Sequence, residues 1–260
     1  MIKTEGMVKI LLVVGMIVVM LLMFSCSKSV SQESAWRNTP LNKPIEIRLN
    51  NSTRITFDLD QADVTFYTGK EKNIQITYEP KAFETVPDYS SLAPDVKTVK
   101  KELHISMQSP DHHPHINIYI PPTVEQITIL HEKGTLLFND DITAQLTVKG
   151  NKSDIKVNYI QSLLNINVSE GNVSIMKGIL PQGSNITVEV GNINVCADLE
   201  DGEYLFSTEY GNIDFRSNTK GVNLSAIGYT RLNDFPGYQA GATSVTLDSK
   251  VGFISASGEY

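Results

Sequence analysis

The sequence has little of what disulfide scaffolds and several enzyme classes depend on. It has two cysteines, Cys26 and Cys196, in 260 residues, so a disulfide-rich fold is excluded. It lacks a Cys-x-x-Cys pair, a glycine-rich phosphate loop and a Gly-x-Ser-x-Gly elbow. Basic residues are also few, with 22 Lys and Arg against 29 Asp and Glu. The net charge of −7 argues against a nucleic-acid partner, and the 20% charged fraction is too low for a disordered chain.

Long hydrophobic runs are absent except for one at the N-terminus. Residues 10–24 are apolar or Gly, Lys3 and Lys9 precede them, and the small residue Ser25 follows. A helix that crosses a bilayer usually needs about 20 apolar residues, so this run is short for a permanent span. The pattern is typical of a secretory signal peptide.

The residues at the end of this run predict a lipid anchor. Met23-Phe24-Ser25-Cys26 resembles a bacterial lipobox, in which the cysteine becomes the lipidated first residue of the mature chain. We predict a signal peptide over residues 1–25, palmitate-type lipid on Cys26 and a polar, Ser-rich linker over residues 26–40. An uncleaved signal anchor and an unlipidated secreted protein are the alternatives. The anchor would hold the chain at the cell membrane or the outer membrane, outside the cytoplasm.

The remaining chain shows no amphipathic helix and many short runs in which apolar and polar residues alternate. Examples are residues 45–49, 55–59, 74–78 and 116–120. Alternation with a period of two predicts strands with one buried face. We therefore predict an all-β fold over residues 41–260.

The second half of the sequence repeats itself about every twenty residues. The segments that begin at Gly171, Gly191 and Gly211 share a Gly-Asn start and alternating apolar residues, and looser copies begin at Gly134 and Ser153. A unit this short cannot bury a core alone, so its copies must stack. We predict a single-chain β-solenoid with coils of about 20 residues; a β-sandwich of hairpins is the rival architecture.

Stacked coils would place equivalent residues about 4.8 Å apart in columns. Two columns would be wholly apolar and face inward: Leu136, Ile155, Val173, Ile193 and Ile213; Phe138, Val157, Ile175, Val195 and Phe215. Each copy is also preceded by a second strand with an apolar residue five positions before the Gly or Ser: Ile129, Val148, Ile166, Ile186 and Phe206. Another column would stack polar side chains at the bend, where they would form a hydrogen-bonded ladder: Asp154, Asn172, Asn192 and Asn212. Cys196 follows Val195 in a strand pattern, so we expect it in or near the core.

Residues able to support chemistry are sparse. The outward column between the core residues is Leu137, Lys156, Ser174, Asn194 and Asp214, with one carboxylate where glycoside hydrolysis needs two. We expect no enzymatic activity and no cofactor; a polysaccharide-active enzyme is the least favoured alternative. His112, His113 and His115 are weak candidates for a metal site, although the prolines around them favour a solvated loop.

One candidate binding surface precedes the bends. The residue before each repeat Gly becomes apolar late in the series, at Val190 and Tyr210, with Tyr229 as the next expected member. These three side chains would form an exposed apolar strip suited to an envelope glycan or a membrane protein.

The leader, the segment Ile116 to Pro121 and the serial Gly-Asn-Ile-x-Val strands together resemble a bacterial β-strand-repeat family of domains of unknown function, often labelled adhesins. The resemblance spans roughly residues 41–260 and implies a β-solenoid displayed on the cell envelope. It supplies no catalytic residues. An adhesin-like or structural binding module is therefore the first functional hypothesis. An envelope-stress or regulatory accessory that works through a membrane protein is the second.

Overall fold

The computed structural model describes residues 43–79, 93–108, 113–232 and 243–258. The predicted signal peptide, Cys26, the linker and His112 lie outside these ranges. Within them the chain forms strands, bridges and turns and no helix, so the all-β prediction is confirmed for this part of the chain. No helix among the residues described is long and apolar enough to span a membrane.

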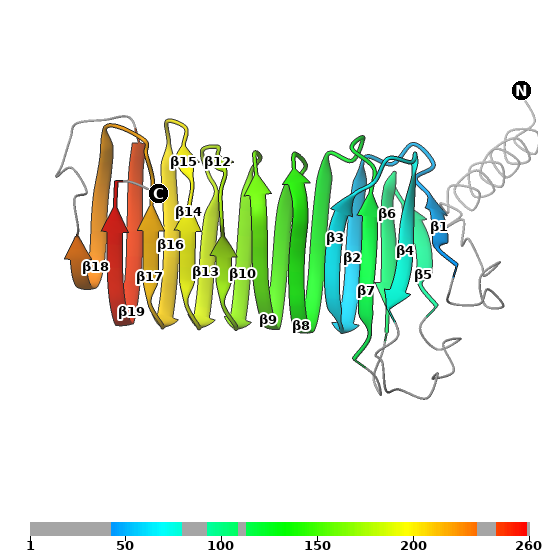
Figure 1. The fold of residues 1–260 in the computed structure, drawn as a ribbon, viewed down its shortest axis with the longest axis horizontal. Helices are drawn as coiled ribbons and strands as arrows, with labels where there is room; N and C mark the ends of the chain where they lie inside the picture. The colour runs from blue at the N-terminus through cyan, green and yellow to red at the C-terminus, as the bar shows by residue number, and fades with distance from the viewer. Residues whose placement is uncertain (1–42, 80–92, 109–112, 233–242, 259–260) are drawn as a thin grey trace, which may run out of the picture.

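The first seven strands form one end of the molecule. They are β1 (Ile45–Arg48), β2 (Arg54–Gln61), β3 (Asp63–Thr68), β4 (Asn73–Glu79), β5 (Asp95–Val99), β6 (Glu102–Met107) and β7 (His115–Ile120). The other twelve form an elongated stack that extends from that end (Figure 1). They are β8 (Gln126–Ile142), β9 (Gln145–Ile160), β10 (Leu164–Glu170), β11 (Val173–Ile175), β12 (Ile179–Leu180), β13 (Asn185–Val190), β14 (Ile193–Cys196), β15 (Asp198–Leu199), β16 (Glu203–Tyr210), β17 (Ile213–Arg216), β18 (Val222–Leu232) and β19 (Thr243–Ser257).

The repeat period corresponds to the register between neighbouring coils. Strand β10 pairs in parallel with β13, and β13 with β16, each with an offset of about 20 residues. The same offset joins β11 to β14 and β14 to β17. Each coil runs along one layer, bends near its glycine and returns along the opposite layer (Figure 1). These parallel pairs follow the 20-residue period of the sequence and differ from the hairpins of the rival architecture.

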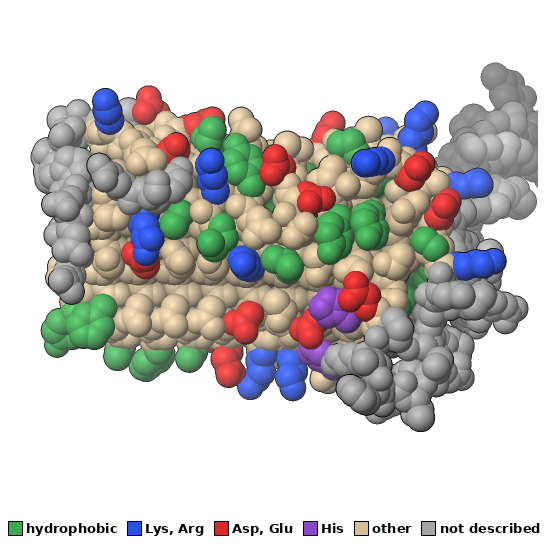
Figure 2. All heavy atoms as spheres, viewed as in Figure 1, with side chains coloured by type: hydrophobic (Ala, Val, Ile, Leu, Met, Phe, Trp, Pro, Cys, Tyr) green, Lys and Arg blue, Asp and Glu red, His purple; other side chains and the backbone are tan. Residues whose placement is uncertain are grey.

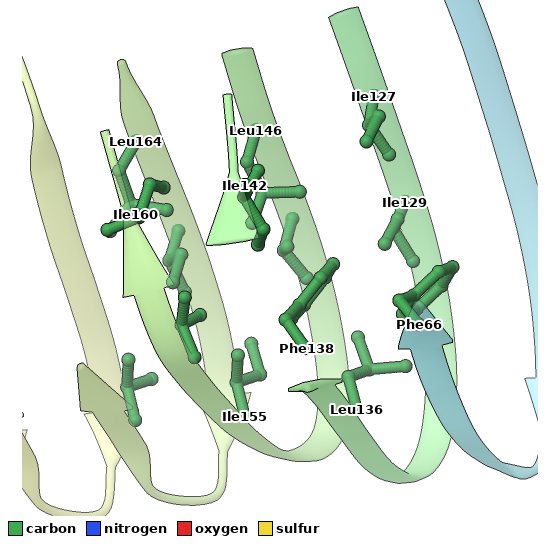
Figure 3. Packing of buried hydrophobic residues seen from close by; sticks show 14 of the residues in the cluster. Phe66, Ile127, Ile129, Leu136, Phe138, Ile142, Leu146, Ile155, Ile160 and Leu164 are labelled. Atoms are coloured by element: carbon green, nitrogen blue, oxygen red, sulfur yellow. The ribbon is translucent and has the colours of Figure 1, made fainter. Parts of the chain in front are cut away.

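The apolar columns lie between the two layers, as the period predicts. Leu136 pairs with Ile155, Ile155 with Val173, and Val173 with Ile193, all of them buried. Figure 3 shows Ile127 and Ile129 from the first part of β8 facing Leu136 and Phe138 from its later part. Because each coil contributes to the same continuous interior, the core extends along the whole stack.

The polar column at the bend forms the expected ladder. Asp154 Oδ1 accepts hydrogen bonds from the backbone N–H (2.8 Å) and the side-chain Nδ2 (3.0 Å) of Asn172. Asn172 Oδ1 accepts the same pair from Asn192, at 3.1 and 3.0 Å. Asn192 Oδ1 accepts from Asn212 N–H at 2.9 Å, and Asn212 Oδ1 accepts from Phe253 N–H at 2.9 Å. The ladder thus satisfies one backbone donor at each bend.

The N-terminal end contains antiparallel pairs that the sequence did not predict. Strand β4 pairs antiparallel with both β1 and β7, and β5 pairs antiparallel with β6. Strands β2 and β3 pair in parallel with β8, so Phe57 and Phe66 extend the apolar columns. Among the described strands, β1 and β5 are the edge strands of this end, since each pairs on one side only.

The C-terminal coils are not stacked in sequence order, which corrects our expectation of serial copies. The later strand β19 pairs with both β16 and β17 and thus lies next to the coil of Glu203–Arg216. The earlier strand β18 pairs only with β19 among the strands described and lies at the end of the stack. Strand β19 therefore lies between β18 and the coil of Glu203–Arg216, although β18 precedes it in the sequence.

Candidate functional site

The residues that precede the Gly or Ser of each bend form one continuous row across the coils. Register pairs join its members in this order: Lys133, Lys152, Glu170, Val190, Tyr210 and Val251. The first half is charged, and Lys152 Nζ lies 2.9 Å from Glu170 Oε2. The second half is apolar. Figure 2 shows this change along the lower edge, where basic and acidic side chains give way to hydrophobic ones toward the C-terminal end.

Exposed apolar side chains gather at the bends of the last coils. We call this group the apolar ridge, and its members are at least 49% exposed: Val190, Tyr210, Ile227, Tyr229, Val251 and Phe253. The rings of Tyr229 and Phe253 are 6.3 Å apart and tilted by 47°. Six of the ten exposed large hydrophobic side chains in the described chain belong to this ridge, so they are concentrated rather than scattered.

The ridge includes the three predicted residues but arranges them differently. Val190 pairs with Tyr210 as expected, whereas Val251 lies beside Tyr210, where Tyr229 was expected. Tyr229 lies on β18, beyond β19, and pairs there with Phe253. The sequence missed the other three members because the last two coils lack the Gly-Asn pair that marks the bend. These coils keep the bend glycine, in the pairs Gly228-Tyr229 and Gly252-Phe253. The glycine was the sequence signal that could have located these bends.

His113 and His115, the two histidine candidates that the structure describes, have different acidic neighbours. His113 Nε2 lies 3.1 Å from Asp63 Oδ1, while His115 Nε2 lies 4.0 Å from Glu79 Oε2. Burial raises the pKa of Asp63, but the hydrogen bond and charge of His113 and the Thr135 N–H outweigh it and hold that pKa below its usual value. The described ranges contain no group of three or more His, Cys, Asp or Glu side chains placed to hold a metal ion.

His131 is a buried titratable group that the sequence did not single out. Its Nε2 lies 3.0 Å from the carbonyl oxygen of Ala62 and its Nδ1 lies 2.8 Å from Ser153 Oγ. A carbonyl only accepts, so Nε2–H donates to Ala62, and Nδ1 of the neutral ring accepts from Ser153 Oγ–H. Burial lowers the pKa of His131 below its ordinary value, although the Ala62 hydrogen bond and nearby carboxylates oppose this.

The protein is expected to become less stable as the pH is lowered, because of His131. The unfolded chain binds a proton at this residue near pH 6.5, whereas the folded chain resists it. Between that pH and the lower pKa of the folded chain, the unfolded state carries more protons. The free energy of unfolding therefore decreases by about 1.4 kcal/mol for each pH unit in this window. Urea unfolding from pH 7.5 to 5 should show a flatter pH dependence for His131→Leu than for the unsubstituted chain. His104→Gln, at a half-buried position on β6, serves as control, and equal slopes for His131→Leu and the parent chain would contradict the assignment.

The outward column and the second cysteine offer no reactive group. Register pairs place Lys156, Ser174, Asn194 and Asp214 in line, and Asp214 forms an ion pair with Arg216 at 2.5 Å. The column thus contains one carboxylate, already paired. Cys196 is buried, as expected, and burial raises the pKa of its thiol, which keeps it in the unreactive protonated form.

Comparison with known proteins identifies the family. The model of the Toastrack DUF4097 family matches residues 52–195, which is more than half of the chain. The chain belongs to the Toastrack family. The match confirms the resemblance to a bacterial domain of unknown function that the repeats suggested. It covers strands β2 to β13 and most of β14, whereas five of the six ridge residues lie beyond it.

Several solved structures are similar to this Toastrack chain. A candidate cell adhesion protein from Clostridium sporogenes has 15% identity and a TM-score of 0.38, over 83% of this chain and 99% of that one. A candidate adhesin from Bacteroides fragilis has 15% identity and a TM-score of 0.36, over 82% and 96%. A candidate adhesin from Parabacteroides distasonis has 12% identity and a TM-score of 0.45, over 82% and 96%. No curated protein matches the chain significantly.

Proposed function

We propose that this Toastrack chain is a non-catalytic, adhesin-like binding module built on a β-solenoid and held at the cell envelope by an N-terminal lipid. The parallel register and the continuous core support a solenoid, which presents an extended surface without risk to its interior. An adhesin-like role also agrees with the descriptions of the similar solved structures named above, which are candidate adhesion proteins.

The observation that carries the binding function is the apolar ridge. The paired strands β16 and β19 carry the exposed side chains of Tyr210, Val251 and Phe253. Side chains held in this way lose little freedom when a partner covers them, so their apolar area contributes efficiently to affinity. The charged residues Lys152 and Glu170 continue the same row and would form a polar rim at one end.

We favour a protein over a glycan as the partner. Val190, Ile227 and Val251 supply aliphatic surface, which packs well against apolar protein side chains but offers no ring face for a sugar. A regulatory accessory that acts through a membrane protein would use the same surface. The identity of the captured partner distinguishes that role from adhesion.

Crosslinking in the native envelope tests the ridge. Replacement of Tyr210 and Phe253 together by Ser should weaken capture of a protein partner about 30-fold, because central aromatic side chains typically contribute 2 kcal/mol or more. Leu205→Ser, at another exposed apolar position outside the ridge, is the matched control and should leave capture unchanged. Both variants should unfold at similar urea concentrations. Unchanged capture by the ridge variant would contradict the proposal, and retention only on envelope polysaccharide would favour the glycan.

The lipid anchor has a separate test. Labelled palmitate should enter the chain and the label should be lost in Cys26→Ser, because the thiol is the attachment point that the lipobox-like sequence predicts. Ser25→Ala leaves the thiol in place and serves as the control. Label that persists in Cys26→Ser would show that lipid is not attached there.

A further inference from the structure

A pocket opens at the edge of the stack opposite the glycine bends, near its N-terminal end. Its volume is about 540 Å³, within the range of about 300–1,000 Å³ typical of small-molecule sites. Phe66 and Phe138 lie on its inner side with their rings stacked at 4.7 Å. Val124, Ile127 and Ile142 contribute further apolar wall. Figure 3 shows Phe66, Phe138, Ile127 and Ile142 projecting into the same interior.

The pocket exists because one coil does not complete its turn. Strand β3 pairs with β8 only from Val64 to Phe66, and at Gly69 the chain leaves toward β4 instead of crossing this edge. The register of β8 against β9 also shifts between Phe138 and Asp141. The coil that contains β3 therefore adds no strand beyond Thr68 at this edge.

The burial of equivalent residues marks this opening. Ile142 pairs with Ile160, and Ile160 has no exposed surface whereas Ile142 keeps 8%. Ile127 pairs with Leu146, which is likewise fully buried, whereas Ile127 keeps 5%. Equivalent core positions that are sealed in the next coil thus keep a small exposed surface here. An opening onto a close-packed core is uncommon in a folded protein and provides ready apolar contact for a ligand.

The mouth of the pocket carries negative charge. Asp140 and Asp141 lie at the rim, and no Lys, Arg or His is among the described residues that line the pocket. Asp140 is held in place, since its Oδ2 accepts a hydrogen bond from Thr68 N–H at 2.9 Å and its Oδ1 accepts from Asn139 Nδ2 at 3.2 Å. The Thr68 hydroxyl donates to the Asp141 carbonyl at 3.3 Å. These contacts hold the carboxylate-bearing end of β8 beside the apolar wall.

We propose that this pocket, which we call the rim pocket, binds a small amphiphilic cation: an ammonium group joined to an aromatic or hydrocarbon body. The apolar body would lie against Phe66, Phe138 and Ile127, and the ammonium would meet the carboxylates of Asp140 and Asp141 at the mouth. Anionic amphiphiles of the same size would be repelled by the rim. The proposal is independent of the apolar ridge, which lies at the bends near the opposite end of the stack.

Three probes of matched size test the rim pocket: 4-phenylbutylamine, 4-phenylbutanol and 4-phenylbutyrate. Ligand-observed NMR with the full chain in lipid nanodiscs, and with empty nanodiscs as blank, should show saturable binding of the amine. Binding of the butyrate should be at least tenfold weaker, and the alcohol should lie between them. The double variant Asp140→Asn/Asp141→Asn should bind the amine at least threefold more weakly, because two partly exposed charges are lost. Asp248→Asn on β19 is the control and should change nothing.

A second variant tests the cavity itself. Ala144 lies in the pocket wall, so Ala144→Phe should fill the space and abolish binding of the amine. Equal binding of the three probes, no saturable binding of the amine to the parent chain, or an unchanged amine affinity in the double Asn variant would each overturn the proposal. The double Asn variant changes exposed or half-buried side chains and keeps the acceptor for Thr68, so it remains informative where Ala144→Phe fails to fold.

Discussion

Deletion of residues 172–191 is expected to yield a shorter protein that still folds cooperatively. The deletion removes one complete coil and joins Gly171 directly to Asn192, so the Gly-Asn bend is restored at the junction. Ile166 would then pair with Phe206 in place of Ile186, and Val157 with Val195 in place of Ile175. Both columns remain apolar and the ladder acceptor Asp154 regains a partner. The stack loses one unit and one interface, which lowers its stability without breaking it.

Deletion of residues 172–181 is expected to be more harmful although it removes half as many residues. It takes away half a coil, so the next bend, at Gly191, would arrive at the edge where the connection between β9 and β10 lies. The Asn ladder would be interrupted and inward columns on the two sides of the junction would no longer be in register. We expect this variant to be at least about 3 kcal/mol less stable than the full-coil deletion, because an entire interface of core residues is lost.

Urea unfolding followed by far-ultraviolet circular dichroism compares the two deletions directly. The full-coil variant should show one cooperative transition with a slightly reduced m-value, in proportion to the smaller buried surface. The half-coil variant should show an early or a broad transition. Equal stability of the two deletions would contradict a 20-residue structural unit.

The regular part of this fold could be predicted because its signals repeat. A single Gly-Asn pair means little, but three copies at the same spacing fix which side chains face inward, and the registers of Val173, Ile193 and Ile213 follow directly. Alternation does not reveal whether two strands run parallel or antiparallel. The antiparallel pairs of β4 with β1 and β7 were therefore beyond reach of the pattern.

The C-terminal end could not be predicted because chain order and spatial order differ there. Phe253 stands at the position of the ladder Asn, and its backbone N–H donates to Asn212 Oδ1 in the same way. The coil therefore joins the ladder without an Asn of its own, and the Gly-Asn motif does not reveal it. The apolar ridge was consequently recognised only in part. The rim pocket was missed for a different reason, since it depends on where the chain leaves the stack after Gly69 rather than on which residues line it.

Replacement of Gly191 by Ala is expected to destabilise the fold by at least about 3 kcal/mol. Gly191 has φ of 147°, a conformation that L-residues rarely adopt. A Cβ at this position would lie 1.8 Å from the carbonyl oxygen of Gly171 in the preceding coil. The contact is with backbone, so no side-chain rotation relieves it. The backbone N–H of Gly191 also donates to the Tyr210 carbonyl at 2.9 Å, which limits how far the coils can separate.

Two further Gly→Ala variants separate the causes of this loss. Gly183 has φ of 83° but open space around it, with Leu163 Cδ1 at 3.8 Å as the nearest atom to a Cβ, so Gly183→Ala measures backbone strain alone, about 1–3 kcal/mol. Gly69 has an ordinary φ and no contact closer than 3.4 Å, so Gly69→Ala should be neutral or stabilising by up to about 1 kcal/mol. The loss should therefore increase from Gly69 to Gly183 to Gly191. If Gly191→Ala and Gly183→Ala unfold at the same urea concentration, the close approach of neighbouring coils does not set the requirement for glycine at the bend, and the conformation of the bend alone explains the repeat.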